Sequence, residues 1–179
     1  MHIGKPVRRV EDTRFLTGRG RYVDDLDLPG AAHAAFLRSP HAHGTIRNLD
    51  LDPARAMPGV LLVMAGDEWR DAGGGALPVI AEVPFSDGRP MAEAWRPVFA
   101  TDRVRHVGDT LALVVAETAA EAQDAVEAIG LDIEPLPVAG TTEAALADGA
   151  PLLHDMCPGN LCYDWQSGDR EAVERALAS

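Results

Sequence analysis

Six histidines offer the first candidates for chemistry in this sequence. His41 and His43 alternate along a short segment, so an extended backbone would place both imidazoles on one face. Two imidazoles can bind a metal ion, but a catalytic zinc needs a third protein ligand, and no HExxH-type motif supplies one. We therefore interpret the pair as hydrogen-bonding residues at a strand end. The remaining histidines are isolated in the sequence: His2, His33, His106 and His154.

Two cysteines, Cys157 and Cys162, lie five positions apart in the segment CPGNLC. Two thiols cannot complete a structural zinc site, and this spacing matches no CxxC redox motif. So few cysteines are typical of a reducing compartment. We expect two free thiols and a cytoplasmic location.

Asp24, Asp25 and Asp27 resemble part of a calcium-binding loop, but the glycine and the closing glutamate of that motif are missing. We interpret them as solvated turn carboxylates. No serine occupies a GxSxG elbow, and neither cysteine lies in a motif that identifies a nucleophile. The residues taken alone therefore predict no catalytic, cofactor-binding or metal-binding site.

The net charge of −12 is unevenly distributed along the 179 residues. Residues 1–21 contain six basic and two acidic side chains, a net +4, so the remainder carries −16. A basic arm suits nucleic acid, but the acidic remainder would repel phosphate and few aromatic residues interleave with the arginines. We favour an arm that lies across an acidic partner surface. Arg8-Arg9 is followed by no apolar stretch, which excludes a twin-arginine export signal, and no apolar run is long enough to cross a bilayer.

A strand, a helix and a second strand follow one another in the second half of the chain. Leu111 to Ala116 is an unbroken apolar run, typical of a strand covered on both faces. Thr118 and Glu121 form a capping box at a helix start, and Gly130 can supply the left-handed residue that ends the helix. Residues 131–134 alternate like a half-buried strand. The connection is long enough for the two strands to be parallel with a right-handed crossover, and we expect this βαβ unit to be the core.

The other elements are short, and Asp52 and Thr142 are the expected helix caps. Residues 72–96 mix apolar pieces with glycine and proline, which predicts a long surface loop of the kind that often contacts a partner. The pattern as a whole indicates an α/β (α+β) fold. Strands are predicted at about 32–38, 44–51 and 60–64, and helices at about 52–57, 67–71, 143–147 and 171–178.

Short motifs follow in a fixed order along almost the whole chain. They are Arg9-Val10-Glu11-Asp12, Arg14-Phe15-Leu16-Thr17-Gly18, Gly20, Tyr22-Val23-Asp24-Asp25, Arg38-Ser39-Pro40-His41-Ala42-His43, Pro58-Gly59-Val60, Val107-Gly108-Asp109, Ala116-Glu117-Thr118, Glu134-Pro135-Leu136-Pro137 and Gly159-Asn160-Leu161. In this order they resemble the N-terminal part of the large subunit of the molybdenum hydroxylases, the family of xanthine dehydrogenase, aldehyde oxidase and carbon monoxide dehydrogenase.

The resemblance implies an extended N-terminal arm at 1–30, an α/β hammerhead domain with a βαβ core unit at 31–150, and at 151–179 the start of a linker towards a molybdopterin-binding domain that is absent here. It implies molybdopterin cytosine dinucleotide, [2Fe-2S] clusters and FAD for the complete complex, with none bound by this chain. The implied partners are a molybdopterin-binding domain or subunit, an iron–sulfur subunit and an FAD subunit, and neither nucleic acid nor a membrane.

On this resemblance the chain is expected to be the structural and assembly portion of a molybdenum-dependent oxidoreductase, inactive when isolated. The family's catalytic residues lie further along a longer chain, so none is transferred to a position here. The alternative is a stand-alone interaction module or a truncated product without activity. An interface module should expose large apolar side chains, whereas an arm and a tail that fold back would bury them. The candidates are Phe15, Leu16, Tyr22, Phe85, Trp95 and the tail from Leu161 to Trp165.

Overall fold

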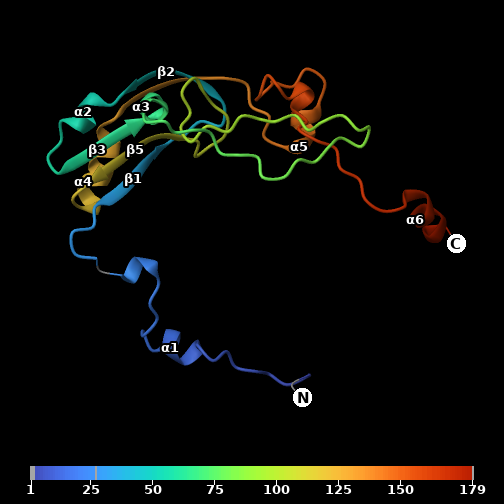
Figure 1. The fold of residues 1–179 in the computed structure, drawn as a ribbon, viewed down its shortest axis with the longest axis horizontal. Coiled ribbons are helices and arrows are strands. Elements are labelled where there is room, and N and C mark those ends of the chain that lie inside the picture. Colours follow the sequence, from blue (N-terminus) through green and yellow to red (C-terminus); the bar gives the residue numbers. More distant parts are fainter. Residues whose placement is uncertain (1–2, 27, 179) are drawn as a thin grey trace. The chain divides into compact units, whose positions relative to one another are not determined.

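The chain divides at Ala31 into two units, Met1–Ala31 and Ala32–Ser179, which are treated separately. The structure is a computed structural model that describes residues 3–26 and 28–178 (Figure 1). The strands of the second unit are His33–Arg38 (β1), Gly44–Asp50 (β2), Val60–Ala65 (β3), Arg103–Val104 (β4), Thr110–Ala116 (β5) and Gly130–Pro135 (β6). Its helices are Asp52–Arg55 (α2), Gly66–Asp71 (α3), Ala119–Ala128 (α4), Thr142–Leu146 (α5) and Arg170–Leu177 (α6), and Pro158–Asn160 forms a 3₁₀ turn (η2).

Two small antiparallel sheets form the second unit. The first has the order β1-β5-β3, and the second has the order β4-β2-β6. In the first sheet Ala35 pairs with Val114 on one side of β5, and Val63 pairs with the same valine on the other. The mixed α/β (α+β) class predicted from the sequence is confirmed.

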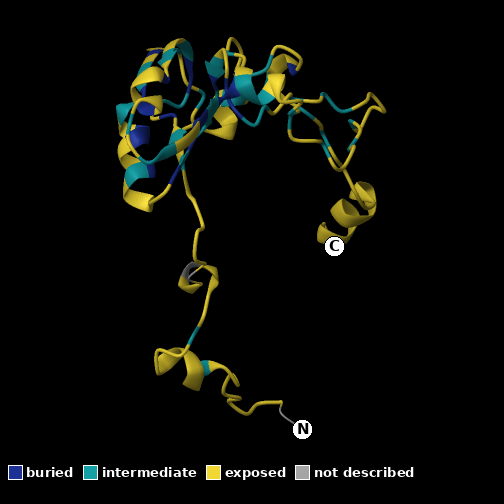
Figure 2. Ribbon diagram, turned by 60° about the vertical axis from the view of Figure 1, so that its left-hand side comes forward, coloured by how far each residue is buried: buried dark blue, intermediate teal, exposed yellow. Residues whose placement is uncertain are grey.

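Strand β5 is the centre of the core. Leu111, Ala112, Val114 and Ala116 have no exposed surface, and α4 packs on β1 and β5 (Figure 1). Ala112 and Val114 belong to a cluster between the first sheet and α4, whereas Leu111 belongs to a second cluster at the other sheet. Buried residues therefore concentrate around this strand, as the colouring of Figure 2 shows. The predicted strand at Leu111–Ala116 is confirmed, but it is not fully covered on both faces, because Leu113 and Val115 are only half-buried.

The expected parallel βαβ unit is wrong, although its order of strand, helix and strand is right. Both edges of β5 are already hydrogen-bonded, to β1 and to β3, so no edge remains for β6. The chain instead leaves α4 and enters the other sheet, where β6 pairs antiparallel with β2. Leu49 and Leu131 are partners in that pairing.

Helix caps follow the sequence signals to within one residue. Thr118 accepts a hydrogen bond from the Glu121 backbone, and the Glu121 carboxylate accepts the Thr118 N–H, so the predicted capping box is confirmed. The capping side chain of α5 is Thr141 rather than Thr142, because the Thr141 hydroxyl accepts the Ala144 N–H at 3.1 Å.

Two other expected helix boundaries are wrong. Gly130 is the first residue of β6, not the left-handed end of α4, because the backbone is already extended at Ile129. Asp52 is the first residue of α2, and the flanking position expected for it is taken by Leu51. In both cases the next element begins one residue earlier than the local signal predicts.

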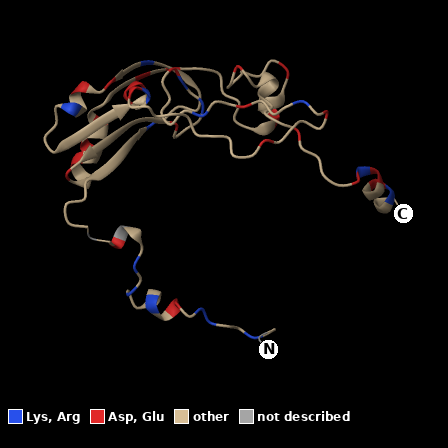
Figure 3. Cartoon of the chain, viewed as in Figure 1, with Lys and Arg blue, Asp and Glu red and all other residues tan. Residues whose placement is uncertain are grey.

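The first unit contains a short helix, Asp12–Leu16 (α1), and a 3₁₀ turn, Val23–Asp25 (η1), so the arm is not extended throughout. The rings of Phe15 and Tyr22 stack with centroids 5.5 Å apart. Leu16 and Val23 are exposed. Basic residues recur along this unit (Figure 3).

Polar side chains hold the segment after β6 in place through hydrogen bonds to backbone groups. Asn160, whose φ is +57°, accepts the Leu153 N–H and donates to the carbonyls of Ala145 and Pro151, at 2.9 to 3.0 Å. Arg105 donates to the carbonyl of Leu153 at 2.8 Å. Residues 145–161 are therefore fixed at several points. Beyond them every residue of α6 is exposed.

Residues 72–102 contain neither a helix nor a strand, as the sequence predicts for 72–96. Isolated backbone hydrogen bonds hold them, such as the one from the Leu77 N–H to the Arg96 carbonyl at 2.8 Å. No helix in the described part of the chain is long and apolar enough to span a membrane.

Replacement of Val114 by aspartate tests the central position of β5. The carboxylate would be buried without a partner, so we expect Val114→Asp to lower the free energy of unfolding by several kcal/mol, comparable to the whole stability of a marginal domain. Val107 is 64% exposed, so Val107→Asp should change stability by less than about 0.5 kcal/mol. Urea unfolding followed by circular dichroism compares the two. A soluble Val114→Asp protein as stable as Val107→Asp would contradict the core assignment.

Replacement of Gly44 tests the contact between β2 and β6. A Cβ atom at Gly44 would collide with the Ile133 side chain and lie 3.0 Å from the Glu134 carbonyl oxygen. We expect Gly44→Ala to cost about 1–3 kcal/mol of stability. Gly75 has open space around it, so Gly75→Ala is the matched control and should be neutral or slightly stabilising. Equal thermal midpoints for the two variants would show that β2 and β6 can move apart at Gly44 without loss of stability.

Candidate functional site

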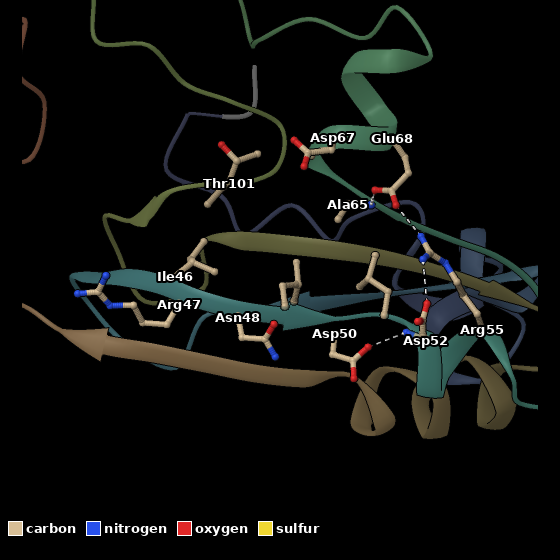
Figure 4. A pocket seen from close by; sticks show the side chains of 14 residues that line it. Ile46, Arg47, Asn48, Asp50, Asp52, Arg55, Ala65, Asp67, Glu68 and Thr101 are labelled. Carbon is tan, nitrogen blue, oxygen red and sulfur yellow. Dashed lines mark hydrogen bonds and ion pairs between the residues drawn. The ribbon is translucent and has the colours of Figure 1, made fainter.

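A polar groove of about 440 Å³ lies beside β2 in the second unit. One wall is β2 from Ile46 to Asp50, and the other walls are α2, the start of α3 and Thr101 (Figure 4). The fold creates the groove because the chain leaves β2 into α2 and returns along β3 into α3. The charged residues that line it are Arg47, Asp50, Asp52, Arg55, Asp67 and Glu68.

Arg55 is the central cation of this groove. Its guanidinium donates to Glu68 Oε1 at 2.5 Å and to Asp52 Oδ1 at 3.3 Å. The second oxygen of Glu68 accepts the Ala65 N–H at 3.1 Å, at the start of α3. Figure 4 shows this chain of contacts from Asp52 through Arg55 to Glu68. One arginine thus links α2 to α3.

The electrostatics of the groove favour the ionised form of Glu68. Burial opposes the charge of Glu68, but hydrogen bonds from backbone N–H groups and from Arg55 outweigh it and lower the pKa of Glu68. The hydrogen bond to Glu68 in turn raises the pKa of Arg55. Arg47 forms its own ion pair with Glu134. Carboxylates that are easily ionised are poor proton donors, so the arrangement suits a structural ion-pair network better than acid catalysis.

The histidines in the described part of the chain are not gathered into a metal site. His43 lies just before β2 and is buried, and its Nδ1 lies 2.7 Å from the Pro137 carbonyl oxygen, which agrees with hydrogen bonding at a strand end. His41 is attached through its backbone N–H to the Ser39 hydroxyl. No group of three or more potential metal ligands occurs among residues 3–26 and 28–178. His2 lies outside the described residues.

The acidic cluster in the first unit is part of a turn. The carboxylate of Asp25 accepts the Tyr22 N–H at 2.9 Å within η1. This is the arrangement expected of a turn carboxylate. Asp27, which belongs to the same acidic cluster in the sequence, lies outside the described residues.

Cys157 and Cys162 are free but lie together, with their sulfur atoms 3.6 Å apart. This contact is not predicted from the sequence, because the spacing of the two cysteines matches no familiar dithiol motif. The Pro158-Gly159-Asn160 segment between them is the available signal, since such residues form tight turns.

The first sheet has an apolar face on the side opposite to α4. We call the residues Phe36, Leu62, Met64, Leu113 and Val115 the open sheet face. Strand pairing sets Phe36 beside Leu113 and Leu62 beside Val115, which places them on one side of the sheet. Phe36 is 46% exposed and Leu62 is 42% exposed.

Most of the apolar side chains predicted to be exposed are exposed. They are Phe15, Leu16, Tyr22, Trp95, Leu161, Tyr163 and Trp165, whereas Phe85 is half-buried. The open sheet face was not among the predicted residues. The period-2 pattern of β1 shows two faces but does not say which face a helix covers.

Comparison with known proteins gives the family of the chain. Residues 17–137 match the family model described as the aldehyde oxidase and xanthine dehydrogenase a/b hammerhead domain. The large subunit of nicotine 6-hydroxylase from Paenarthrobacter nicotinovorans is 38% identical over 159 residues, which are 89% of this chain and 19% of that protein. The large chain of carbon monoxide dehydrogenase from Afipia carboxidovorans is 34% identical over 188 residues, 98% of this chain and 22% of that one.

The fold also resembles that of a solved structure with similar sequence. The crystal structure of quinoline 2-oxidoreductase from Pseudomonas putida 86 has a TM-score of 0.66 and 41% identity, covering 82% of this chain and 18% of that one. This chain spans about a fifth of the length of the curated relatives that it matches.

Replacement of Glu68 tests the groove network by its pH dependence. A carboxyl whose folded pKa is lowered stabilises the fold above its unfolded value, and that contribution is lost as the pH falls through the folded pKa. The side chains of Glu68 and Arg55 are both partly exposed. We therefore expect Glu68→Gln to lower the free energy of unfolding by less than about 1 kcal/mol near pH 7 and by still less near pH 3. Urea unfolding of the wild type, Glu68→Gln, Arg55→Met and the double variant measures the coupling. A coupling that stays constant between these pH values would contradict the ionised pair.

Proposed function

The chain belongs to the aldehyde oxidase and xanthine dehydrogenase family of molybdenum hydroxylases, and from this membership we propose that it is a structural and assembly portion of a large subunit. In this proposal the chain has no molybdenum active site of its own. Residues 1–30 act as an arm, 31–150 as the hammerhead domain and 151–179 as the start of a linker. The complete complex is an oxidoreductase that hydroxylates an aldehyde, a heterocycle or a related carbon with oxygen from water.

The open sheet face is the observation that carries the assembly role. Two large apolar side chains, Phe36 on β1 and Leu62 on β3, leave nearly half of their surface exposed on a sheet whose other face is covered by α4. Neighbouring exposed apolar residues of this kind usually mark an interface. The relatives have about four-fifths of their length beyond the matched region. We propose that this remaining part of the large subunit covers the open sheet face.

The residues of this chain do not fit the cofactors that the family implies. A [2Fe-2S] cluster needs four ligands, most often thiolates, and the chain has two cysteines. The pyrophosphate of a dinucleotide would meet the carboxylates of the polar groove, where Arg47 and Arg55 are already paired. We propose that molybdopterin cytosine dinucleotide, the iron–sulfur clusters and FAD are bound elsewhere in the complex, on the molybdenum-binding part and on separate iron–sulfur and FAD subunits.

The basic arm suits a second contact of the same assembly. Its +4 charge between residues 1 and 21 complements an acidic surface, and Arg14 lies 4.9 Å from the Phe15 ring centroid. We propose that this arm packs on a neighbouring domain or subunit of the complex in the cytoplasm.

Assembly with the rest of the large subunit tests this function. We expect the chain, coexpressed with the protein that supplies the molybdenum-binding part in its source organism, to copurify with it. Phe36→Ser combined with Leu62→Ser should weaken the complex at least tenfold, because two large apolar contacts are lost. Val107→Ser combined with Leu146→Ser, two exposed apolar residues outside the open sheet face, is the matched control.

Hydrogen exchange locates the contact in the same complex. Slower exchange at β1, β3 and residues 12–26 on assembly is the expected result. No copurification, or equal affinity of both double variants, would favour the alternative of a stand-alone module. Tight binding of molybdopterin by the chain without a partner would overturn the proposal that it is free of cofactor.

A further inference from the structure

The turn at 157–162 brings together two thiols that the proposed function does not use. Cys157 Sγ and Cys162 Sγ are 3.6 Å apart. Between them the backbone has positive φ at two successive residues, +67° at Gly159 and +57° at Asn160. The Asn160 N–H donates to the Cys157 carbonyl at 2.9 Å and closes the turn. The turn folds the chain back so that the two side chains meet.

The turn is anchored on both sides, so the contact between the sulfur atoms does not depend on the turn alone. The Asn160 side chain makes three hydrogen bonds, to Leu153, Ala145 and Pro151. The carbonyl of Cys162 accepts the Ala92 N–H at 2.8 Å. Anchors of this kind raise the effective concentration of one thiol near the other.

The two thiols differ in access to solvent. Cys157 is 1% exposed, and burial together with the neighbouring Cys162 raises the pKa of Cys157 to about 11. Cys162 is partly exposed and lines a mainly apolar pocket of about 350 Å³ with Val79, Met91, Ala92 and Tyr163. A small reagent therefore reaches Cys162 first, while Cys157 stays behind it as a protonated thiol.

We propose that Cys157 and Cys162 are a redox-active dithiol that closes to an intrachain disulfide by exchange with a small soluble disulfide. The Cys162 thiolate attacks one sulfur of the small disulfide, forms a mixed disulfide and releases one small thiol. Cys157 then loses its proton and attacks the Cys162 sulfur, which releases the second small thiol. The protein loses two electrons and two protons, and the small disulfide is reduced to two thiols.

The geometry requires only a small movement for closure. A disulfide bond is about 2.05 Å long, so the sulfur atoms must approach by roughly 1.5 Å, which side-chain rotation can supply. The closed bond would fix the turn that holds Ala92 and Asn160. It would thereby attach residues 79–96 more firmly to the segment that follows β6.

Glutathione redox buffers test this proposal on the full chain. The reduced protein is equilibrated at several ratios of reduced to oxidised glutathione, quenched with acid and alkylated, and its intact mass is measured. We expect a form with two fewer hydrogens and no alkylation to exceed the glutathione adduct at least tenfold, because the second thiol is already in place. Accumulation of the adduct without closure, or complete alkylation of both cysteines in excess oxidised glutathione, would overturn the proposal.

Single variants separate the roles of the two thiols. Cys157→Ser should stop at a glutathione adduct on Cys162, and Cys162→Ser should react at least tenfold more slowly, because its remaining thiol is buried. Equal rates would contradict the order of attack. Asn160→Gly keeps positive φ accessible but removes the side-chain anchors, and it should lower the ratio of closed form to adduct about tenfold. An unchanged ratio would contradict the anchored turn, and circular dichroism confirms that each variant is folded.

Discussion

The pairing of β5 on both edges is the constraint on which the second unit depends. Because β1 and β3 occupy its two edges, the strand that follows α4 must enter another sheet, and the two-sheet architecture results. The side chains of β5 reinforce this. Ala112 and Ala116 are small, and α4 presents the buried Ala122 and Ala125, so helix and strand can approach closely. On the other side Leu111 fills the second core cluster, so one strand contributes to both.

Local sequence signals predicted the helices and strands. They could not predict which strands pair, because the paired strands are far apart in the sequence. The reciprocal bonds of Thr118 and Glu121 are encoded within four residues, and that capping box was predicted correctly. Thr141 and Thr142 are chemically equivalent, so only the backbone conformation decides which of them caps α5. The parallel crossover was a reasonable local inference. It failed because β1, more than seventy residues earlier in the sequence, already occupied an edge of β5.

The candidate site was less predictable than the fold because its parts lie on different elements. Arg55 and Glu68 are thirteen residues apart, on helices separated by a strand, and no periodic pattern links them. The thiol contact depends on two successive residues with positive φ, and Asn160 adopts this conformation while its side chain is held by three neighbours. The exposed rings of the arm and tail were easier to predict, since they lie outside every periodic segment. The family was predicted from the short motifs, because these are recognised by their order along the chain and do not depend on contacts in the fold.

The position of β5 in the sequence also sets the order of events during synthesis. Strands β1 and β3 do not pair with each other. Both pair with β5, which is synthesised after them. About fifty residues separate the end of β3 from the end of β5, which at ribosomal speed corresponds to roughly 2–10 s. During that interval the apolar β1 and β3 are outside the ribosome without the template that will join them. Chaperone binding to the nascent chain should therefore peak before Ala116 emerges and fall once it has done so.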